Sequence, residues 1–341
     1  MTKKPVTIKE IAKEAGVSIA TVSMIFNNKD KSISQATREK VLEIAKEKDY
    51  IPNSMARSLV TRQSRTLGLV LPDIVNPFFP EIARGAEDKA RQARYSIIIC
   101  NTDDNLEQED KYIDILTEKM VDGIIFAHSA DRKDIARESR KYRMPIVLID
   151  RDYAMPNVMG KVLIDNQKAS CKGVNYLLEK GYKKIAYIAG SMNTQTAKDR
   201  LDGYKNALAQ NKITYDNHYV KIGEYKSQWG MEATRQLLEE NIPFDAIFCG
   251  NDLIAIGAMK ALKEASLRVP EDVGIMGFDD IYVASMVEPE LTTIKQPIYE
   301  MGYRAAEILI DGIENKEQPR NKSSEGRKII LDTELIVRKS S

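Results

Sequence analysis

The sequence predicts an α/β protein with a small helical head at its N-terminus and a larger body of two lobes built on parallel sheets. Residues 7–27 have the spacing of two short helices joined at Gly16. From residue 66 onward, short apolar runs alternate with amphipathic stretches, which is typical of βα units on sheets buried on both faces. A chain of 341 residues is also long for one core, so two lobes and a small extra domain are expected.

Residues 7–27 predict a helix-turn-helix, a motif whose second helix fits the DNA major groove. Gly16 suits the left-handed backbone that often ends a helix, and Ser18 can cap the next helix by accepting a hydrogen bond from the amide of Thr21. The expected buried faces are Ile8, Ile11, Ala12 and Ala15 in the first helix and Val22, Ile25 and Phe26 in the second. An ordinary helical hairpin is the alternative, but the glycine and the cap at these offsets favour the DNA-binding motif.

A third helix is predicted to begin after Ser34. Its expected buried set is Val41, Leu42, Ala45 and Tyr50. Pro52 restricts the preceding residue and ends the pattern. Asn53 or Ser54 could cap a short fourth helix within 53–60, which on its own would be marginal in water. We therefore expect that helix to form only when something holds it.

The body of the chain contains seven short apolar runs that predict strands. They are residues 66–71, 95–100, 123–126, 146–149, 184–189, 246–249 and 273–278. Helix-like segments separate most of them. We expect about ten strands in all, which is more than a single hydrophobic core accommodates. The pattern therefore favours two lobes.

Charge is unevenly distributed along the chain. Residues 1–65 hold 13 Lys or Arg against 7 Asp or Glu, whereas the remaining 276 residues hold 38 against 43. A basic head on an acidic body fits a local contact with phosphates, although a solvated helical surface is the alternative.

Three cysteines, Cys100, Cys171 and Cys249, lie far apart in apolar runs, so we expect small buried residues in a reducing compartment. No metal site is expected, because the chain lacks Cys-x-x-Cys and has only two histidines, His128 and His218. The charged N-terminus lacks an apolar signal core, and no apolar run approaches about 18 residues, which predicts a soluble, cytoplasmic protein.

Polar planar groups and aromatic rings follow the ends of the predicted strands, as in Phe78-Phe79, Asp150-Arg151 and Phe278-Asp279. In parallel sheets these positions gather at one edge, and in a two-lobed protein that edge faces a cleft. A sugar needs this mixture, because carboxylates, amides and arginines bind hydroxyls while flat rings cover C–H faces. The alternatives are ordinary: Asp73, Asp252 and Asp280 as caps or turn formers, the two phenylalanines as core, and Asp150-Arg151 as a structural ion pair.

Residues 7–60 resemble the DNA-binding head and hinge of the LacI/GalR family of bacterial transcription regulators. The matching motifs include Thr-Ile-Lys-Glu-Ile-Ala at 7–12, Ala-Gly-Val-Ser at 15–18, Tyr-Ile-Pro-Asn at 50–53 and Ala-Arg-Ser-Leu at 56–59. The resemblance implies DNA contacts from Thr7, Ser18, Ile19, Ala20, Thr21, Ser23, Met24, Asn27, Asn53, Ala56, Arg57 and Leu59. Leu59 would wedge into the minor groove of a kinked operator. Met24 stands where several relatives carry a base-reading Arg or His, so the operator sequence stays open.

The rest of the chain is similar to the family's core, which has a periplasmic-binding-protein fold. The resemblance implies a DNA-binding domain at 1–51, a hinge helix and linker at 52–63, and a ligand-binding and dimerisation core at 64–341. The first lobe would take 65–160 and 291–325, and the second 163–290 and 326–341. Strand 292–295 would link the lobes, helix 299–315 would cover the first lobe, and strand 329–337 would return to the second.

The same resemblance implies sugar-binding positions in the cleft. They are Asn76, Phe78, Phe79, Asp150, Arg151, Arg200, Tyr225, Asn251, Asp279 and Gln296. Tyr225 is preferred to Trp229 for covering the ligand, His128 is not expected to touch it, and no cofactor is implied. The implied ligand is a monosaccharide such as the pentose ribose, or a related polyol.

Together these features predict a DNA-binding regulator, in the simplest case a repressor, whose two paired chains bring two heads onto a palindromic operator. A sugar would control the hinge helix, with the sign of the response and dimer versus tetramer left open. A secreted sugar receptor is disfavoured by the basic head, and an enzyme using Asp150 and Asp279 by the lack of a catalytic motif. Catabolite control through a phosphoprotein partner is disfavoured because Glu307 and Asp311 stand where that branch of the family carries basic residues.

Overall fold

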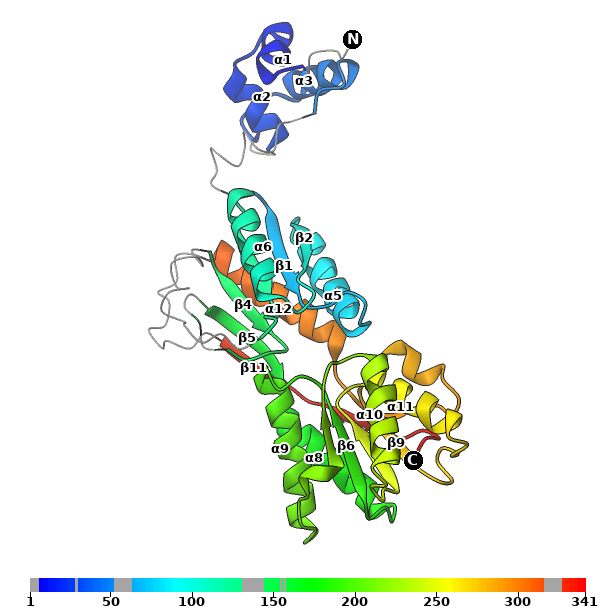
Figure 1. The fold of residues 1–341 in the computed structure, drawn as a ribbon. Coiled ribbons are helices and arrows are strands. Elements are labelled where there is room, and N and C mark those ends of the chain that lie inside the picture. Colours follow the sequence, from blue (N-terminus) through cyan, green and yellow to red (C-terminus); the bar gives the residue numbers. More distant parts are fainter. Residues whose placement is uncertain are drawn as a thin grey trace. The chain divides into compact units, whose positions relative to one another are not determined.

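The computed structural model describes residues 6–27, 30–51, 63–130, 144–153, 155, 158–315 and 327–341. The chain divides into two compact units, Met1–Ser64 and Arg65–Ser341 (Figure 1). Each unit has its own hydrophobic core. The first unit is the helical head, and the second holds two six-stranded sheets.

The head contains α1 (Ile8–Ala15), α2 (Ile19–Phe26) and α3 (Gln35–Glu47). Gly16 ends α1 with a φ of 71°, and the hydroxyl of Ser18 accepts a hydrogen bond from the amide of Thr21 at 3.0 Å. Both predicted signals for the turn are therefore confirmed. The core consists of Ile11, Ala12, Ala15, Val22, Ile25, Val41, Ile44 and Ala45, with Ile8, Phe26 and Tyr50 packed against it at partial exposure.

One core prediction in the head is wrong. Leu42 is 39% exposed, whereas Ile44 is buried. Residues three and four apart share a helix face, so Ile44 and Ala45 lie on the inner face of α3 with Val41, and Leu42 lies to the side.

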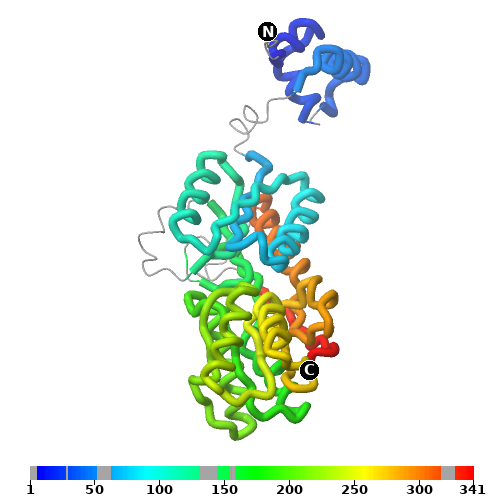
Figure 2. The backbone as a smooth tube through the Cα atoms, turned by 45° about the vertical axis from the view of Figure 1, so that its right-hand side comes forward, coloured from blue at the N-terminus to red at the C-terminus, as the bar shows by residue number. Residues whose placement is uncertain are grey.

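The first lobe is built on an all-parallel sheet of order β11-β5-β4-β3-β1-β2. Its strands are β1 (Thr66–Leu71), β2 (Ser96–Asn101), β3 (Gly123–Phe126), β4 (Ile146–Ile149), β5 (Val158–Ile164) and β11 (Arg327–Leu331). The described helices of this lobe are α5 (Phe78–Gln92), α6 (Leu106–Glu118) and α12 (Ile298–Glu314). Figure 2 shows α12, in orange, lying within this lobe beside α5 although it is distant in sequence.

The second lobe is built on a sheet of order β12-β10-β9-β8-β6-β7, in which only β12 runs antiparallel among the described strands. Its strands are β6 (Ile185–Ala189), β7 (Val220–Ile222), β8 (Ala246–Cys249), β9 (Gly274–Asp279), β10 (Thr292–Lys295) and β12 (Glu334–Ile336). Its helices are α8 (Asn166–Glu179), α9 (Gln195–Gln210), α10 (Ser227–Glu239) and α11 (Asp252–Glu264). All seven predicted strands are present within one residue of their expected bounds.

Three boundaries between the lobes differ from expectation. β5 stays in the first sheet through Ile164, and β10 belongs to the second sheet, not to the first lobe. The single strand predicted at 329–337 is two strands, because the chain leaves the first sheet after Leu331 and joins the second at Glu334. An apolar run shows that a segment is buried, but it does not identify the sheet that buries it.

Helices α5 and α12 pack unusually closely on the first lobe. A Cβ on Gly85 would lie 2.0 Å from the carbonyl oxygen of Tyr299, and a Cβ on Gly302 would lie 2.0 Å from that of Ile82. Glycine at both positions lets the two backbones touch, which fixes α12 to the lobe it was predicted to cover.

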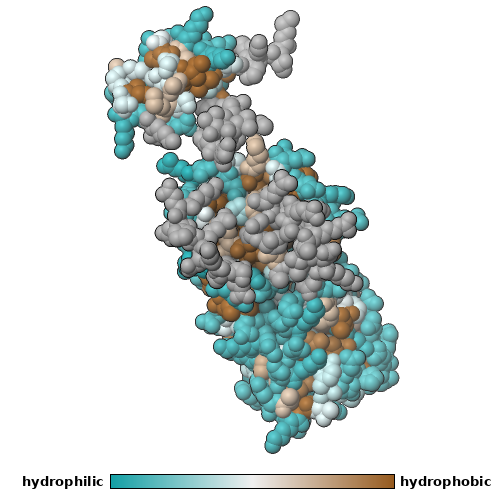
Figure 3. Space-filling view, turned by 90° about the vertical axis from the view of Figure 1, so that its left-hand side faces the viewer, coloured by the Kyte–Doolittle hydropathy of each residue, from teal (hydrophilic) through white to brown (hydrophobic). Residues whose placement is uncertain are grey.

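The cysteines differ in burial. Cys100 and Cys249 are buried, and burial raises the pKa of Cys100 to about 11, but Cys171 is only half-buried, so that part of the prediction is wrong. In the ranges given above, no helix combines the length and apolar character needed to cross a membrane. Hydrophilic residues cover most of the described surface on the face drawn in Figure 3.

Candidate functional site

The head presents one end of α2 to the surroundings. Of the predicted DNA contacts, Thr7, Ser18, Ile19 and Ala20 are exposed, and Thr21, Ser23, Met24 and Asn27 are half-buried. The buried Val22 and Ile25 attach the opposite face of α2 to the head core. This arrangement leaves the N-terminal residues of the second helix available for base edges. The other predicted contacts, Asn53, Ala56, Arg57 and Leu59, lie outside the described residues.

The ten predicted sugar-binding residues lie at the carboxyl ends of strands or on the helices that follow. Tyr225 is half-buried, and the other nine are at most 6% exposed. These nine are Asn76, Phe78, Phe79, Asp150, Arg151, Arg200, Asn251, Asp279 and Gln296. The two lobes meet at this edge, because the hydroxyl of Thr196 on α9 donates to the carbonyl of Asp150 after β4 at 3.3 Å. The structure thus places residues of both lobes at one junction, and we call this junction, with the ten residues named here, the cleft.

Arg200 is the central cation on the second-lobe side. Its Nε donates to Oδ1 of Asn166 at 2.8 Å, and its Nη1 donates to the carbonyl of Gly250 at 2.6 Å. Nη1 also lies 3.6 Å from Oδ1 of Asp279. The guanidinium stacks over the ring of Phe278 with its carbon 3.8 Å from the ring centroid. The fork is therefore fixed on several sides before any ligand binds.

Arg151 is the corresponding cation on the first-lobe side. Its Nη1 donates to the carbonyls of His128 and Ser129, both at 2.7 Å, and contacts Oδ1 of Asp104 at 3.2 Å. The loop that supplies these carbonyls is itself held, because the buried carboxylate of Glu109 accepts the amide of Ser129 at 2.7 Å. His128 thus contributes its backbone to the position of Arg151.

Two buried aspartates face the two arginines. Asp150 has its Oδ2 3.6 Å from Nε of Arg151, and burial raises its pKa against the opposing effect of Arg151 and Arg200. Burial also raises the pKa of Asp279 to about 7, although Arg200 and a 2.7 Å hydrogen bond from Nε2 of Gln296 oppose the shift. Each carboxylate therefore lies close to a cation without a full bidentate pair.

Two polar atoms in the cleft have no hydrogen-bond partner among the described residues: the hydroxyl of Tyr225 and Oε1 of Gln296. Leaving a buried polar atom unpaired costs free energy, so such atoms in a native cleft point to a ligand or water. The indole nitrogen of Trp229, in contrast, already donates to the carbonyl of Ala189 at 2.9 Å. The geometry favours Tyr225 over Trp229 as the ligand-facing ring.

Some of the predicted residues also have ordinary structural roles. The side-chain oxygen of Asn251 accepts the amide of Ile254 and caps α11, and that of Asn76 accepts the amide of Phe78 before α5. Phe78 and Phe79 pack edge to face with centroids 5.1 Å apart and belong to the main core. These four residues shape the cleft, but helix capping and packing explain part of their placement.

Three further residues support the site and were not predicted: Glu109, Asn166 and Asp252. Asn166 follows β5, a strand absent from the predicted runs, so its position at a strand end gave no signal. Asp252 is fully buried and accepts the hydroxyl of Thr293 at 2.6 Å and the amide of Ile281 at 2.9 Å. Helix capping, the ordinary alternative for this residue, therefore does not account for its contacts.

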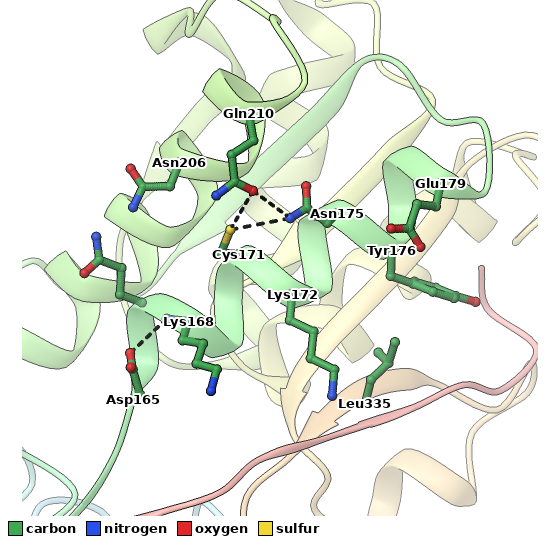
Figure 4. A pocket seen from close by; sticks show the side chains of 11 residues that line it. Asp165, Lys168, Cys171, Lys172, Asn175, Tyr176, Glu179, Asn206, Gln210 and Leu335 are labelled. Carbon is green, nitrogen blue, oxygen red and sulfur yellow. Dashed lines mark hydrogen bonds between the residues drawn. The ribbon is translucent and has the colours of Figure 1, made fainter.

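Two depressions lie in the described part of the second unit. One, of about 790 Å³, is lined by α8, α9 and Leu335, and in it Asn175 and Cys171 contact Gln210 (Figure 4). Its described lining includes none of the ten predicted residues. The other, of about 270 Å³, shares Asp150 and Asn166 with the cleft and lies beside the crossover after β5.

Known families and relatives match nearly the whole chain. Residues 7–53 match the family described as bacterial regulatory proteins, lacI family, and residues 64–333 match periplasmic binding proteins and sugar binding domain of LacI family. The regulator RegA of Clostridium saccharobutylicum is 40% identical over 339 residues, which cover 98% of this chain and 99% of RegA. The ribose operon repressor of Halalkalibacterium halodurans is 37% identical, with 98% and 97% covered. Catabolite control protein A of Priestia megaterium is 36% identical, with 89% and 91% covered.

Solved structures agree with these relatives. The lac repressor dimer bound to operator and the anti-inducer ONPF has a TM-score of 0.85 and 28% identity, with 99% of both chains covered. A LacI family regulator from Enterococcus faecium with bound ribose has a TM-score of 0.70 and 30% identity, with 81% of this chain and 98% of that chain covered. The predicted fold, a helix-turn-helix head with a two-lobed periplasmic-binding-protein-like core, is confirmed. The chain belongs to the LacI family of DNA-binding bacterial transcription regulators.

Proposed function

We propose that this chain is a transcriptional repressor whose affinity for its operator is controlled by a small uncharged sugar bound between the two lobes. The observation that carries the proposal is the cleft itself, where both lobes contribute a buried Asp and a buried Arg. Beside these charges, Tyr225 and Gln296 keep polar atoms without partners among the described residues. A ligand rich in hydroxyls would supply those partners.

The charge balance of the cleft favours a neutral polyol over a phosphorylated sugar. Asp150 and Asp279 offset Arg151 and Arg200, and Nη1 of Arg151 and both Nε and Nη1 of Arg200 already donate to protein acceptors. A phosphate would meet the two carboxylates. Hydroxyls can instead donate to the carboxylates and to Oε1 of Gln296.

The relatives support a pentose as the effector. One relative is named a ribose operon repressor, and one solved regulator of the family contains ribose. We therefore infer ribose, or a monosaccharide or polyol of similar size, as the first ligand to test. Tyr225 and the Phe78–Phe79 pair would cover its C–H faces.

In the head, the recognition surface would be the exposed start of α2, with Thr7, Ser18, Ile19, Ala20 and Thr21 facing DNA. The motif at 53–59, with Asn53, Ala56, Arg57 and Leu59, would enter the minor groove when the hinge helix forms on the operator. Ligand closure of the lobes would alter that helix, and couplings of this kind are typically about 1–3 kcal/mol.

We propose that two copies of the chain pair through their second units, as suits a palindromic operator. Exposed apolar side chains support this: Ile99 on the edge strand β2 is 53% exposed, and Ile222 on the edge strand β7 is 49% exposed. Tyr282 and Met286 are 63% and 73% exposed on the same lobe as β7. Apolar side chains on open sheet edges favour a partner surface. Sedimentation at micromolar concentration tests whether the particle is a dimer or a tetramer.

A protein corepressor is the alternative effector, since catabolite control protein A is a relative. On α12, Glu307 pairs with Lys89 at 3.1 Å and with Arg304 at 2.9 Å, so this part of the helix is already engaged in ion pairs. The small-molecule cleft is therefore the preferred control site.

The test begins with selection of a duplex from a random pool, followed by fluorescence anisotropy on that duplex and on a scrambled control. Affinity should fall with salt, at about −0.9 in log–log slope per phosphate contact. A thermal-shift panel of pentoses, hexoses and polyols should contain a sugar that raises the melting temperature and changes operator affinity. If no duplex were selected, the proposal that the chain is a sequence-specific regulator would be overturned. Chemical turnover of a sugar would favour an enzyme instead.

A further inference from the structure

Three consecutive residues at the end of β9 are each held by a side chain from a different segment. Asp279 and Asp280 have φ values of 113° and 58°, in the left-handed region that residues with a Cβ rarely adopt. Such a backbone persists only when its surroundings hold it, and it is common at binding sites. The residues that hold this turn therefore decide where the carboxylate of Asp279 points.

Two of these contacts come from the cleft itself or its immediate support. Nε2 of Gln296 donates to Oδ1 of Asp279 at 2.7 Å, and the amide of Ile281 donates to Oδ2 of the buried Asp252 at 2.9 Å. The third contact comes from near the C-terminus, where Nη2 of Arg338 lies 2.7 Å from Oδ1 of Asp280.

The ion pair between Arg338 and Asp280 is shielded from solvent. The two side chains are only 16% and 12% exposed. Nη1 of Arg338 also donates to the carbonyl of Leu291 at 2.8 Å, so the guanidinium joins the turn after β9 to the start of β10. A shielded fork with two acceptors holds its partners more firmly than a surface pair does.

The C-terminal segment that carries Arg338 is itself fixed to the second sheet. Ser340 is fully buried, its hydroxyl donates to the carbonyl of Ile275 at 2.6 Å, and it accepts the amide of Thr292 at 2.8 Å. The carbonyl of Ser340 accepts the amide of Ile275 at 2.7 Å. The pairing of β9 with β10 begins at Met276. The C-terminal segment therefore hydrogen-bonds to β9 at Ile275, just before that pairing begins.

We propose that Arg338 is a positioning residue for effector recognition: by holding Asp280, it fixes the strained turn that aims Asp279 into the cleft. The proposal rests on the proposed role of Asp279 in binding a sugar. Arg338 contacts the binding residue only through its neighbour, so its effect should be on geometry. Without it, the turn relaxes toward ordinary backbone angles and moves the carboxylate away from Arg200.

The first measurement is calorimetric titration of the full chain with D-ribose. Arg338→Ala should lower the affinity at least tenfold, and Arg338→Lys should give an intermediate loss, because lysine keeps the charge but not the fork. Lys339→Ala is the matched control. This variant removes a neighbouring ion pair, in which the side chain of Lys339 is 64% exposed and that of Glu290 is 40% exposed. The substitution should change the ribose affinity less than twofold.

The second measurement needs no ligand. Hydrogen exchange followed by mass spectrometry should be at least tenfold faster in Arg338→Ala than in wild type for the peptide that covers 279–286, and unchanged for the peptide that covers β8. If Arg338→Ala does not fold, Asp280→Asn replaces it, because this change weakens the same contact with little change of shape.

Equal ribose affinity and equal exchange in Arg338→Ala and Lys339→Ala would overturn the proposal. Faster exchange throughout the second lobe would also overturn it, because that result indicates a general structural role. Wild-type protein that binds no ribose would count against the proposed effector, and the local exchange comparison would still decide the role of Arg338.

Discussion

The two halves of the cleft differ in how much hydrogen-bonding capacity they leave open. On the first-lobe side, two carbonyls of the same lobe accept Nη1 of Arg151. On the second-lobe side, Tyr225 and Gln296 keep polar atoms that lack partners within the described residues. In the proposed sugar complex, the first lobe would supply charge and aromatic cover, while the second would supply the groups that gain most from the ligand's hydroxyls. Substitutions in the second lobe should weaken effector binding more than matched substitutions in the first.

The largest expected effect comes from Arg200→Met. The change leaves Asp279 and the carbonyl of Gly250 without their cation, and breaking a buried charge pair in this way costs about 3–5 kcal/mol of folding free energy. Ribose affinity should fall more than a hundredfold, as measured by calorimetry, and urea denaturation should give the loss of stability. Operator affinity without sugar should be preserved.

A matched control for this experiment is Lys205→Met on the same helix. Its side chain is 39% exposed and its nearest acid, Asp202, is 3.7 Å away, so the substitution should be close to neutral. If Arg200→Met retained wild-type ribose affinity, the second lobe would not be the main source of binding energy.

Arg151→Met is the direct test from the other half of the cleft. The substitution leaves the carbonyls of His128 and Ser129 unpaired, so the protein should be destabilised by a similar amount. Its effect on ribose affinity should be smaller, about tenfold, or about 1.4 kcal/mol. A loss as large as that of Arg200→Met would show that both halves bind the effector equally and would remove the distinction between them.

The parts of this architecture that could be predicted from sequence are those set by near neighbours. The Ser18 cap, the turn at Gly16 and the strand at 146–149 depend on residues within a few positions of each other, and all three are present. The predicted strands 146–149 and 273–278 also placed Asp150 and Asp279 at strand ends, because polar residues after parallel strands share one edge of the sheet. The full set of ten candidate residues came from the family resemblance.

The parts that could not be predicted depend on partners far along the chain. In the sequence, Glu109 is one acidic residue of a helix and Arg338 is one basic residue near the C-terminus. Their roles come from distant partners, the amide of Ser129 for Glu109 and the carboxylate of Asp280 for Arg338. The split of 329–337 between two sheets has the same cause, because the apolar character of a segment does not determine which strand it pairs with. Long-range pairing, and not local propensity, decides these features.

Tyr225→Phe sharpens the comparison on a single atom. The hydroxyl has no partner within the described residues, so its removal should leave the free protein equally stable or more stable by up to about 1 kcal/mol. If the hydroxyl bonds the effector, ribose affinity should fall about fivefold, which corresponds to about 1 kcal/mol. Thermal unfolding and calorimetry give the two quantities. A destabilised free protein with unchanged affinity would mean that the hydroxyl serves the fold and not the ligand.

The smallest expected effect is a pH dependence from Asp279 on the second-lobe side. Burial raises the pKa of this carboxyl to about 7, so the folded protein holds its proton more tightly than the unfolded chain does. The resulting stabilisation is full below the ordinary pKa of an aspartate and is lost as pH rises through about 7. Hydroxyls of a sugar donate to the ionised form of the carboxyl. Ribose affinity should therefore rise with pH, about threefold between about pH 6.5 and 7.5, while this contribution to stability falls.

Asp279→Asn is the control for this pH dependence. It should bind ribose weakly at every pH and lose the slope. A slope that survives in Asp279→Asn would assign the titration to another group, with Asp150 of the first lobe as the next carboxylate to replace, because burial raises its pKa as well.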